Sequence, residues 1–255
     1  MPKQFDRKAV RVSIYYLIAL AFSFLARFSW HTSDPVVAAP GAMWNLYWHQ
    51  VSALGPFLGA LAIWAAFRPE RSITFGGTWP AMGLCMLAVP ALVLGVLGVD
   101  NGFAVERHVF GAHLGLWIVL YGILEETGWR GYLQGEFANR AAIVRYVIVG
   151  LFWYAWHFSW LIGHSVGGEA AGLAILLLAS VAIGFVAERT RSIFAAAALH
   201  AAGNIFFMTA DFRRIIPSIQ TRGGVALACL AVWLVMLRLW RIRDKRIERA
   251  SASQP

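Results

Sequence analysis

Long apolar stretches constrain this chain more than any other feature of its sequence. The hydrocarbon core of a bilayer is about 30 Å thick, so an α-helix needs about 20 apolar residues to cross it. The chain is therefore predicted to be all-α, a polytopic membrane bundle of about eight transmembrane helices. The stretches lie at roughly 11–30, 44–67, 79–98, 111–127, 143–162, 170–187, 193–210 and 223–241.

The composition agrees with a membrane protein and excludes several other classes. Hydrophobic residues make up 59% of the chain and charged residues only 14%, whereas an ordinary soluble domain is about 25% charged. A net charge of +9 would indicate nucleic acid in a soluble chain. Here the basic residues lie at the ends of apolar stretches, so the expected partner is the lipid bilayer and no nucleic acid. Cys85 and Cys229 lie inside apolar stretches, which argues against a disulfide or a cysteine metal site.

The same basic residues predict the topology through the positive-inside rule. They gather before the first stretch, in residues 3–11, and after the last, in residues 241–249. Both termini are therefore expected in the cytoplasm, which requires an even number of spans. The loops expected outside, 31–43 and 163–169, contain no Lys or Arg. One loop, 211–222, contains three Arg and disagrees with the arrangement of eight spans.

The first polar cluster is an adjacent pair of glutamates, Glu125 and Glu126, followed by Arg130. An ionisable group at membrane depth costs at least about 2.5–3.5 kcal/mol and is a functional candidate by default. Adjacent residues on a helix point about 100° apart, so the two glutamates cannot share one role. Glu126 and Arg130 are spaced i,i+4 and are expected to form a mainly structural pair, which leaves Glu125 as a general base. The alternative is a salt bridge at the helix end, at the cytoplasmic interface.

Two further clusters lie in later apolar stretches: Trp153 with His157, and His200 with Asn204. Taken alone, a histidine among aromatic side chains is more often a satisfied interior residue than a ligand. His200 and Asn204 project from one helical face, where they could also only cross-link helices. One carboxylate, two imidazoles and an amide on three spans together favour a chemical site. The tryptophans, by contrast, are expected in the interfacial belt or in bundle packing.

These residues, in this order, resemble the CPBP family of intramembrane proteases, which includes type II CAAX prenyl proteases, Abi proteins and bacteriocin-processing proteins. The family more often has Phe where this chain has Trp153. The resemblance covers about residues 119–208. Its three motifs are matched by Glu125, Glu126 and Arg130, by Trp153 and His157, and by His200 and Asn204.

The resemblance implies an intramembrane endopeptidase that cleaves a membrane-associated peptide or a lipidated protein, in a cavity open to the cytoplasm. Glu125 would activate a water with His157, while His200 and Asn204 would stabilise the oxyanion of the tetrahedral intermediate. A metalloprotease version stays open, in which Glu125, His157 and His200 ligate Zn²⁺. No His-Glu-x-x-His motif favours that version, and no other cofactor is expected.

Two other functions stay open from the sequence: a non-proteolytic immunity or binding protein of the same family, and a proton- or metal-coupled transporter. The polar residues lie only in spans four, five and seven, without the two related halves typical of transporters. Residues 1–110 are expected to hold spans one to three, 111–215 the CPBP-like catalytic core, and 216–255 the last span and a basic cytoplasmic tail. The sequence at 128–130 resembles bacterial members, which implies the bacterial inner membrane.

Overall fold

The computed structural model describes residues 2–28, 50–161, 165–207 and 215–252, without the side chains of 2–6 and 160. Eight helices of 15 residues or more make up most of this part of the chain, which confirms the all-α bundle. Six are long and apolar enough to cross a membrane, whereas α7 and α9 have 15 residues each. The eight are α1 (Pro2–Phe28), α3 (Gln50–Phe67), α4 (Pro80–Leu97), α5 (Arg107–Gly128), α7 (Ala142–Trp156), α8 (Val166–Thr190), α9 (Ile193–Phe207) and α11 (Ile219–Ala252).

Helix α5 continues further than the apolar pattern predicted. It passes into a π-helical turn, η2 (Trp129–Leu133), and a short helix, α6 (Gln134–Glu136). One helical segment therefore runs from Arg107 to Glu136, and the predicted end of this span at residue 127 is wrong. The helix continues because no proline interrupts it there. The glutamate pair consequently lies inside the segment, directly before a π-helical turn, a feature that is frequent at functional sites.

Helix α7, by contrast, ends earlier than predicted. The apolar pattern placed the fifth span at 143–162, but α7 ends at Trp156 and a 3₁₀ turn, η3 (Ser159–Leu161), follows it. Phe158 has a φ of 52°, in the left-handed region, which is incompatible with further α-helix. The backbone at His157 therefore leaves the helix within the predicted span.

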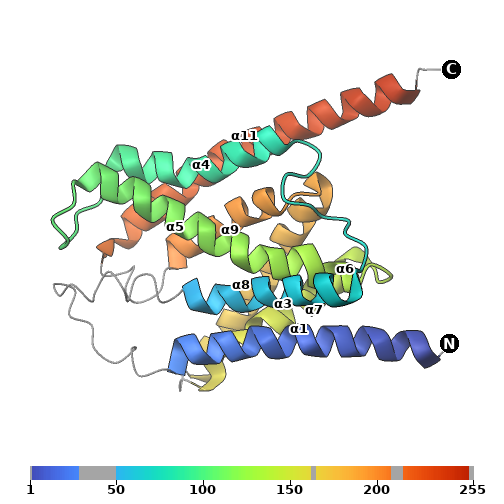
Figure 1. Cartoon of the computed structure of the whole chain (residues 1–255). Coiled ribbons are helices and arrows are strands. Elements are labelled where there is room, and N and C mark those ends of the chain that lie inside the picture. Colours follow the sequence, from blue (N-terminus) through green and yellow to red (C-terminus); the bar gives the residue numbers. More distant parts are fainter. Residues whose placement is uncertain (1, 29–49, 162–164, 208–214, 253–255) are drawn as a thin grey trace.

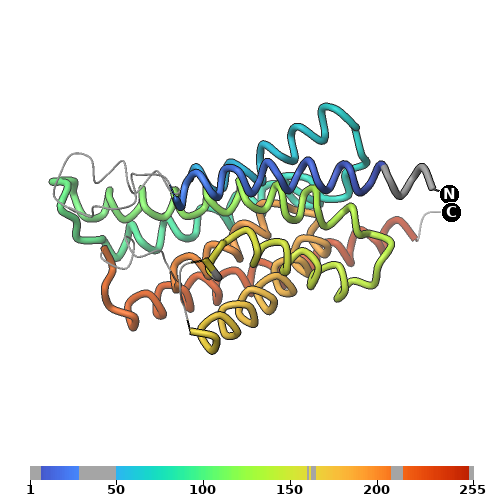
Figure 2. Tube along the Cα trace, turned by 90° about the horizontal axis from the view of Figure 1, so that it is seen from below, coloured from blue at the N-terminus to red at the C-terminus, as the bar shows by residue number. Residues whose placement is uncertain are grey.

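Helix α5 packs against α3, α4 and α9, near the middle of the bundle (Figures 1 and 2). Glycines on α5 permit close contact with its neighbours, as small residues do at helix crossings in membranes. A Cβ on Gly115 would lie 2.5 Å from the backbone of Ala91 on α4, and one on Gly122 would lie 2.9 Å from the carbonyl oxygen of Ala197 on α9. The contact at Gly122 brings the glutamate pair close to the helix that carries His200 and Asn204.

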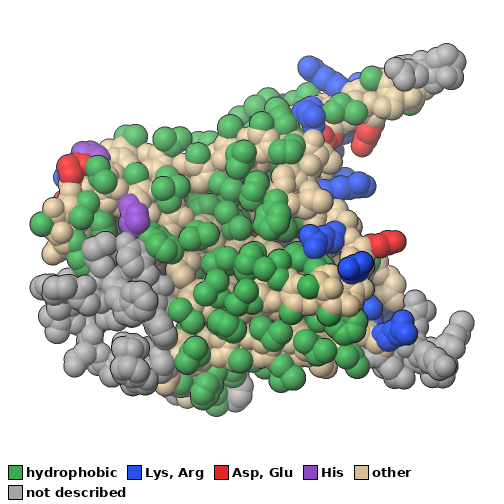
Figure 3. Space-filling view, in the orientation of Figure 1, with side chains coloured by type: hydrophobic (Ala, Val, Ile, Leu, Met, Phe, Trp, Pro, Cys, Tyr) green, Lys and Arg blue, Asp and Glu red, His purple; other side chains and the backbone are tan. Residues whose placement is uncertain are grey.

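Both chain ends lie at the same end of the bundle, as an even number of crossings requires (Figures 1 and 2). Lys and Arg side chains gather at this end, which we call the basic end (Figure 3). They come from the start of α1, the α3–α4 and α8–α9 connections, the start of α7 and the last turns of α11. We call the opposite end the cavity end, for the reason given below.

The loop that disagreed with the predicted topology has a structural explanation for one of its arginines. Arg222 is only 7% exposed, and its Nη1 donates to the carbonyl oxygen of Ile216 at 2.9 Å. This guanidinium therefore ties the residues before α11 to the helix and does not mark a cytoplasmic loop. Arg213 and Arg214 lie outside the described residues. Cys85 is exposed, Cys229 is buried, and both thiols are free.

Candidate active site

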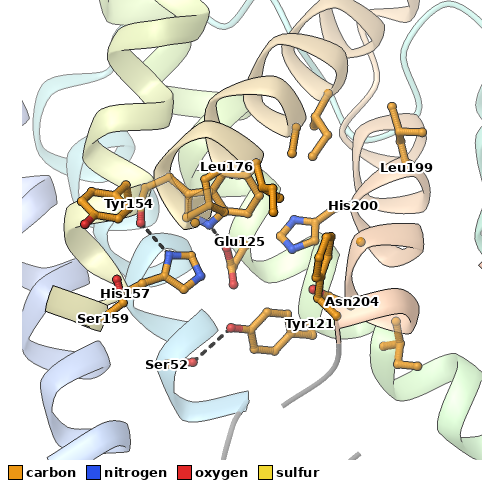
Figure 4. A pocket seen from close by; sticks show the side chains of 18 of the residues that line it. Ser52, Tyr121, Glu125, Tyr154, His157, Ser159, Leu176, Leu199, His200 and Asn204 are labelled. Atoms are coloured by element: carbon orange, nitrogen blue, oxygen red, sulfur yellow. Dashed lines mark hydrogen bonds between the residues drawn. The ribbon is translucent and has the colours of Figure 1, made fainter. Parts of the chain in front are cut away.

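A cavity of about 510 Å³ lies inside the bundle, lined by residues of α1, α3, α5, α7, α8 and α9. Glu125 on α5, His157 just after α7, and His200 and Asn204 on α9 all line it (Figure 4). The structure therefore brings these four predicted site residues together from three segments of the chain. Most of the other lining side chains are aliphatic or small, so polar groups inside the cavity interact in surroundings of low polarity.

Two indole N–H groups hold the carboxylate of Glu125, which is 1% exposed. Its Oε2 accepts a hydrogen bond from Nε1 of Trp129 at 3.1 Å and one from Nε1 of Trp153 at 2.8 Å. Both donors use the same oxygen, so Oε1 is the atom that they leave for other partners. The carboxylate lies between His157 and Tyr121 (Figure 4). At Trp153, the Phe that is more usual in the CPBP family would have no N–H to donate.

The ring of His157 is held by one nitrogen and presents the other to the site. Its Nδ1 lies 2.7 Å from the carbonyl oxygen of Trp153. A carbonyl only accepts, so Nδ1 carries a proton, and in the neutral ring the lone pair is on Nε2. The ring lies beside Glu125 at the wall of the cavity (Figure 4). His157 is thus more than a satisfied interior residue, because Nε2 is the atom available to a water or a substrate.

Glu126 and Arg130 form the predicted pair, with 3.2 Å between Nη1 and Oε2. Both side chains are completely buried and neither lines the cavity. Arg130 also donates from Nη2 to the hydroxyl of Ser180 on α8 at 3.2 Å. The alternative of a salt bridge at the helix end does not agree with the structure, because the helical segment continues beyond this pair to Glu136.

Glu126 has a second partner that the sequence did not predict. Its Oε1 lies 2.6 Å from Nδ1 of His200, and since a carboxylate oxygen accepts, the imidazole donates. Glu126 therefore connects Arg130 on its own helical segment with His200 on α9. With Nδ1 engaged in this way, Nε2 of His200 is the nitrogen available to the cavity.

Tyr121 is a site residue that the sequence analysis missed. It lines the cavity, and its hydroxyl lies 3.3 Å from the hydroxyl of Ser52 on α3 (Figure 4). Tyr121, Glu125 and Trp129 are four residues apart and so share one face of α5 and of its continuation into η2. That spacing around Glu125 was the signal that could have found both aromatic residues. The expectation that tryptophans serve only the interface or packing obscured the role of their N–H groups.

The three residues considered as zinc ligands do not fit a metal site as arranged. In the described ranges, no three side chains of His, Cys, Asp or Glu come close enough to hold a metal ion together. One oxygen of Glu125 is also engaged by two indole N–H donors. Nδ1 of His157 and of His200 each has a protein partner, which is compatible with metal ligation through Nε2. No step of hydrolysis is assigned to a metal ion, and the zinc alternative stays a prediction.

The cavity extends from the four candidate site residues toward the end of the bundle opposite the basic end. Its lining includes Arg27 near the end of α1, Gly168 at the start of α8 and Phe207 at the end of α9. Toward the basic end, Trp129 and Leu133 are completely buried. The expected cytoplasmic termini and the expected cytoplasmic opening of the cavity therefore correspond to opposite ends of the bundle.

Comparison with known families identifies the segment that carries the site. Residues 108–206 match the family model described as type II CAAX prenyl endopeptidase Rce1-like. The match runs from the first turn of α5 into the last turn of α9 and includes every site residue predicted above. It confirms the family resemblance that the three motifs indicated. A comparison with curated proteins gives no match.

Proposed function

Because residues 108–206 are an Rce1-like type II CAAX prenyl endopeptidase (CPBP) family domain, we propose that the protein hydrolyses a peptide bond of a membrane-associated or lipidated substrate. The observation that carries the proposal is the convergence of Glu125, His157, His200 and Asn204 on one largely apolar cavity. This is the residue set of the family's motifs. Intramembrane ionisable groups that line a cavity are functional far more often than structural.

Glu125 is the general base. Its Oε1 takes a proton from a water that also contacts Nε2 of His157, and the resulting hydroxide attacks the carbonyl carbon of the scissile bond. When the tetrahedral intermediate collapses and the C–N bond breaks, Glu125 gives this proton to the leaving amine nitrogen. The two indole donors on Oε2 support this role by fixing the direction of the carboxylate before substrate arrives. Positioned proton transfer of this kind contributes about 10²–10⁴-fold to the rate of hydrolysis.

His200 and Asn204 stabilise the oxyanion of the tetrahedral intermediate. They are spaced i,i+4 on α9 and so present an imidazole and an amide from one helical face. Nδ1 of His200 donates to the carboxylate of Glu126, so Nε2 donates toward the cavity when the ring is an imidazolium, in which both nitrogens carry protons. Preorganised donors in a water-poor site stabilise developing negative charge more strongly than water would.

Glu126 and Arg130 support the site without touching substrate. The buried ion pair fixes Glu126, and Glu126 in turn fixes His200, so the oxyanion donor depends on a charge network behind the cavity wall. We place this site in a protein of the bacterial inner membrane, with spans one to three in 1–110, the catalytic core in 111–215, and the last span and basic tail in 216–255.

The test compares membrane-protein fragments in cells that contain the wild-type chain and cells that contain Glu125→Gln. Gln keeps the shape of the side chain but cannot accept the proton, so fragments generated by the wild-type chain are expected to disappear. Glu106→Gln is the matched control, because it removes a carboxylate at the start of the same helical segment, outside the cavity; its fragments should persist. Unchanged fragments with Glu125→Gln would remove the general-base assignment and leave the non-proteolytic binding protein as the better reading.

A further inference from the structure

The proposed catalytic side chains lie well inside the bundle, about half the thickness of a bilayer core from its basic end. Glu125 precedes Glu136, at the basic end, by eleven residues, which at 1.5 Å per helical residue is about 16 Å. His200 follows Arg191, also at the basic end, by nine residues, or about 14 Å. The hydrocarbon core is about 30 Å thick, so substrate and water must enter roughly half of it to reach the site.

Packed protein closes the route from the basic end. At this end Glu136 on α6 accepts from the Arg11 guanidinium at 2.8 and 2.7 Å. Glu188 on α8 is paired with Arg145 on α7 and also accepts from Tyr146 at 2.6 Å. Each of these pairs joins two helices. The ion pairs therefore hold the helix ends together across the path from the basic end to the cavity.

Between this ionic layer and Glu125 lies a second, apolar layer. Trp129 and Leu133 have no exposed surface, and Tyr132 is 3% exposed. Tyr15 on α1 packs on this layer, with its ring centroid 4.8 Å from that of Tyr132. A peptide could pass here only by displacing fully buried aromatic side chains, which costs several kcal/mol for each one.

The cavity end has the opposite character. The cavity there is lined by glycines that leave space and by polar side chains, among them Gly172 and Glu169 on the first turns of α8. A Cβ on Gly172 would meet no atom within 4 Å. The Glu169 carboxylate accepts from the hydroxyls of Tyr154 at 2.6 Å and Ser159 at 2.9 Å, which makes a polar rim. Polar groups at this depth are typical of a wall that contacts water.

The charge distribution indicates which side of the membrane the cavity end faces. Lys and Arg concentrate at the basic end (Figure 3), and positively charged loops stay in the cytoplasm. We infer that water and substrate reach Glu125 from the non-cytoplasmic face. This direction of access rests on the proposed function. It implies that the substrate is a membrane-anchored peptide whose scissile bond lies in or near the outer half of the bilayer. A lipid-modified C-terminus held on the cytoplasmic leaflet would meet the closed end.

Cysteine labelling with a membrane-impermeant maleimide tests the direction of access and needs no catalysis. Gly167→Cys reports on the side to which the cavity end is exposed, and Gly172→Cys reports on the cavity itself. Gly135→Cys, on α6 at the basic end, is the matched control, because a Cβ at Gly135 or Gly167 also meets no atom within 4 Å. The unsubstituted chain, with exposed Cys85 and buried Cys229, gives the background.

In intact cells, both cavity-end cysteines are expected to react, and Gly135→Cys only after permeabilisation. Labelling of Gly135→Cys in intact cells would overturn the orientation. Labelling of Gly167→Cys without Gly172→Cys would overturn access from this face, with Gly203→Cys on α9 as the second cavity reporter should Gly172→Cys not accumulate. Failure of the peptidase proposal would appear instead as unchanged fragments with Glu125→Gln, whatever the labelling pattern.

Discussion

The two faces of α5 hold buried carboxylates in opposite ways. On the packed face, Glu126 meets Arg130 and His200, so all of its close partners are ionisable protein groups. On the cavity face, Glu125 receives two neutral indole N–H donors on one oxygen. Neither indole occupies its other oxygen, and Glu125 lines the cavity.

A rotation of about 100° between adjacent residues thus separates a structural carboxylate from one placed for chemistry. Neutral donors fix the direction of Glu125 without neutralising it, which preserves its ability to take a proton. The ion pair of Glu126 has the reverse effect and commits that carboxylate to holding other side chains. The comparison predicts that substitutions on the packed face reduce stability and activity together, whereas those on the cavity face reduce activity alone.

Arg130→Ala gives the largest expected effect. It leaves the Glu126 carboxylate buried without its cationic partner, and breaking a buried pair in this way costs about 3–5 kcal/mol. Folded yield and thermal stability in detergent should fall, and activity should fall with them because His200 loses its fixed support. Normal thermal stability with no activity would break the comparison and make Arg130 a substrate or catalytic residue.

Asn204→Ala should reduce activity and leave the fold intact. Loss of one oxyanion donor typically lowers kcat by about 10²–10³-fold. Thermal unfolding should change little, because Asn204 lies at the cavity wall and is only partly buried. The measurement is cleavage of a reporter peptide by purified protein, with metal analysis of the same samples. A metal that is present in the wild-type chain and lost from His157→Ala or His200→Ala would restore the zinc alternative.

Trp153→Phe sharpens the comparison on the cavity face. It keeps the aromatic ring but removes one of the two N–H donors on Glu125, so we expect a drop in kcat of about tenfold, or about 1.4 kcal/mol, with KM unchanged. Trp233→Phe is the matched control, because its N–H donates to the carbonyl oxygen of Met86 away from the cavity. Equal kinetics for the two variants would show that the indole of Trp153 only fills space.

The smallest effect on stability is expected from substitution of Glu106, at the start of α5 and far from Glu125 and Glu126. Glu106 accepts hydrogen bonds from the backbone N–H groups of His108 and Val109, both at 2.9 Å. The Val109 and His108 bonds hold the pKa of the Glu106 carboxyl below its ordinary value. The stabilisation is therefore present above the unfolded-state pKa and is lost as the pH falls through the folded-state pKa.

Thermal unfolding of wild type and Glu106→Gln, followed from about pH 7 to about pH 3, measures this contribution. The variant should unfold at a slightly lower temperature at neutral pH, and the difference should vanish in acid, where the wild-type carboxyl is protonated. A difference that persists in acid would mean that Glu106 acts by packing and not by charge.

The number and order of the helices followed from the sequence because hydropathy reports directly on membrane burial. The site residues followed from the cost of a charge in lipid, which makes Glu125 and the paired Glu126 and Arg130 conspicuous. The bonds from Trp153 to Glu125 and from His200 to Glu126 did not follow, because they join helices whose facing sides hydropathy does not determine. The closed basic end was missed for the same reason: its partners, such as Arg11 and Glu136, are far apart in sequence.

The end of α7 has a consequence for the histidine beside it. Its 15 residues rise about 22 Å, short of the bilayer core, so its last four carbonyls end in a region with little water. All four nevertheless have donors. Those of Trp153 and Tyr154 are bonded by Nδ1 and the backbone N–H of His157, that of Ala155 by the N–H of Phe158, and that of Trp156 by the hydroxyl of Ser23.

His157 thus closes the helix with two donors, one of them from its ring. A substitution there would leave a carbonyl bare in apolar surroundings, so loss of the imidazole would weaken the helix end as well as hydrolysis. In a descendant that no longer cleaved peptides, selection for a stable helix end would still act against substitution of His157. Retention of His157 is therefore weaker evidence for an active enzyme than retention of Glu125, because Gln in place of Glu125 could still accept the two indole N–H bonds without acting as a base.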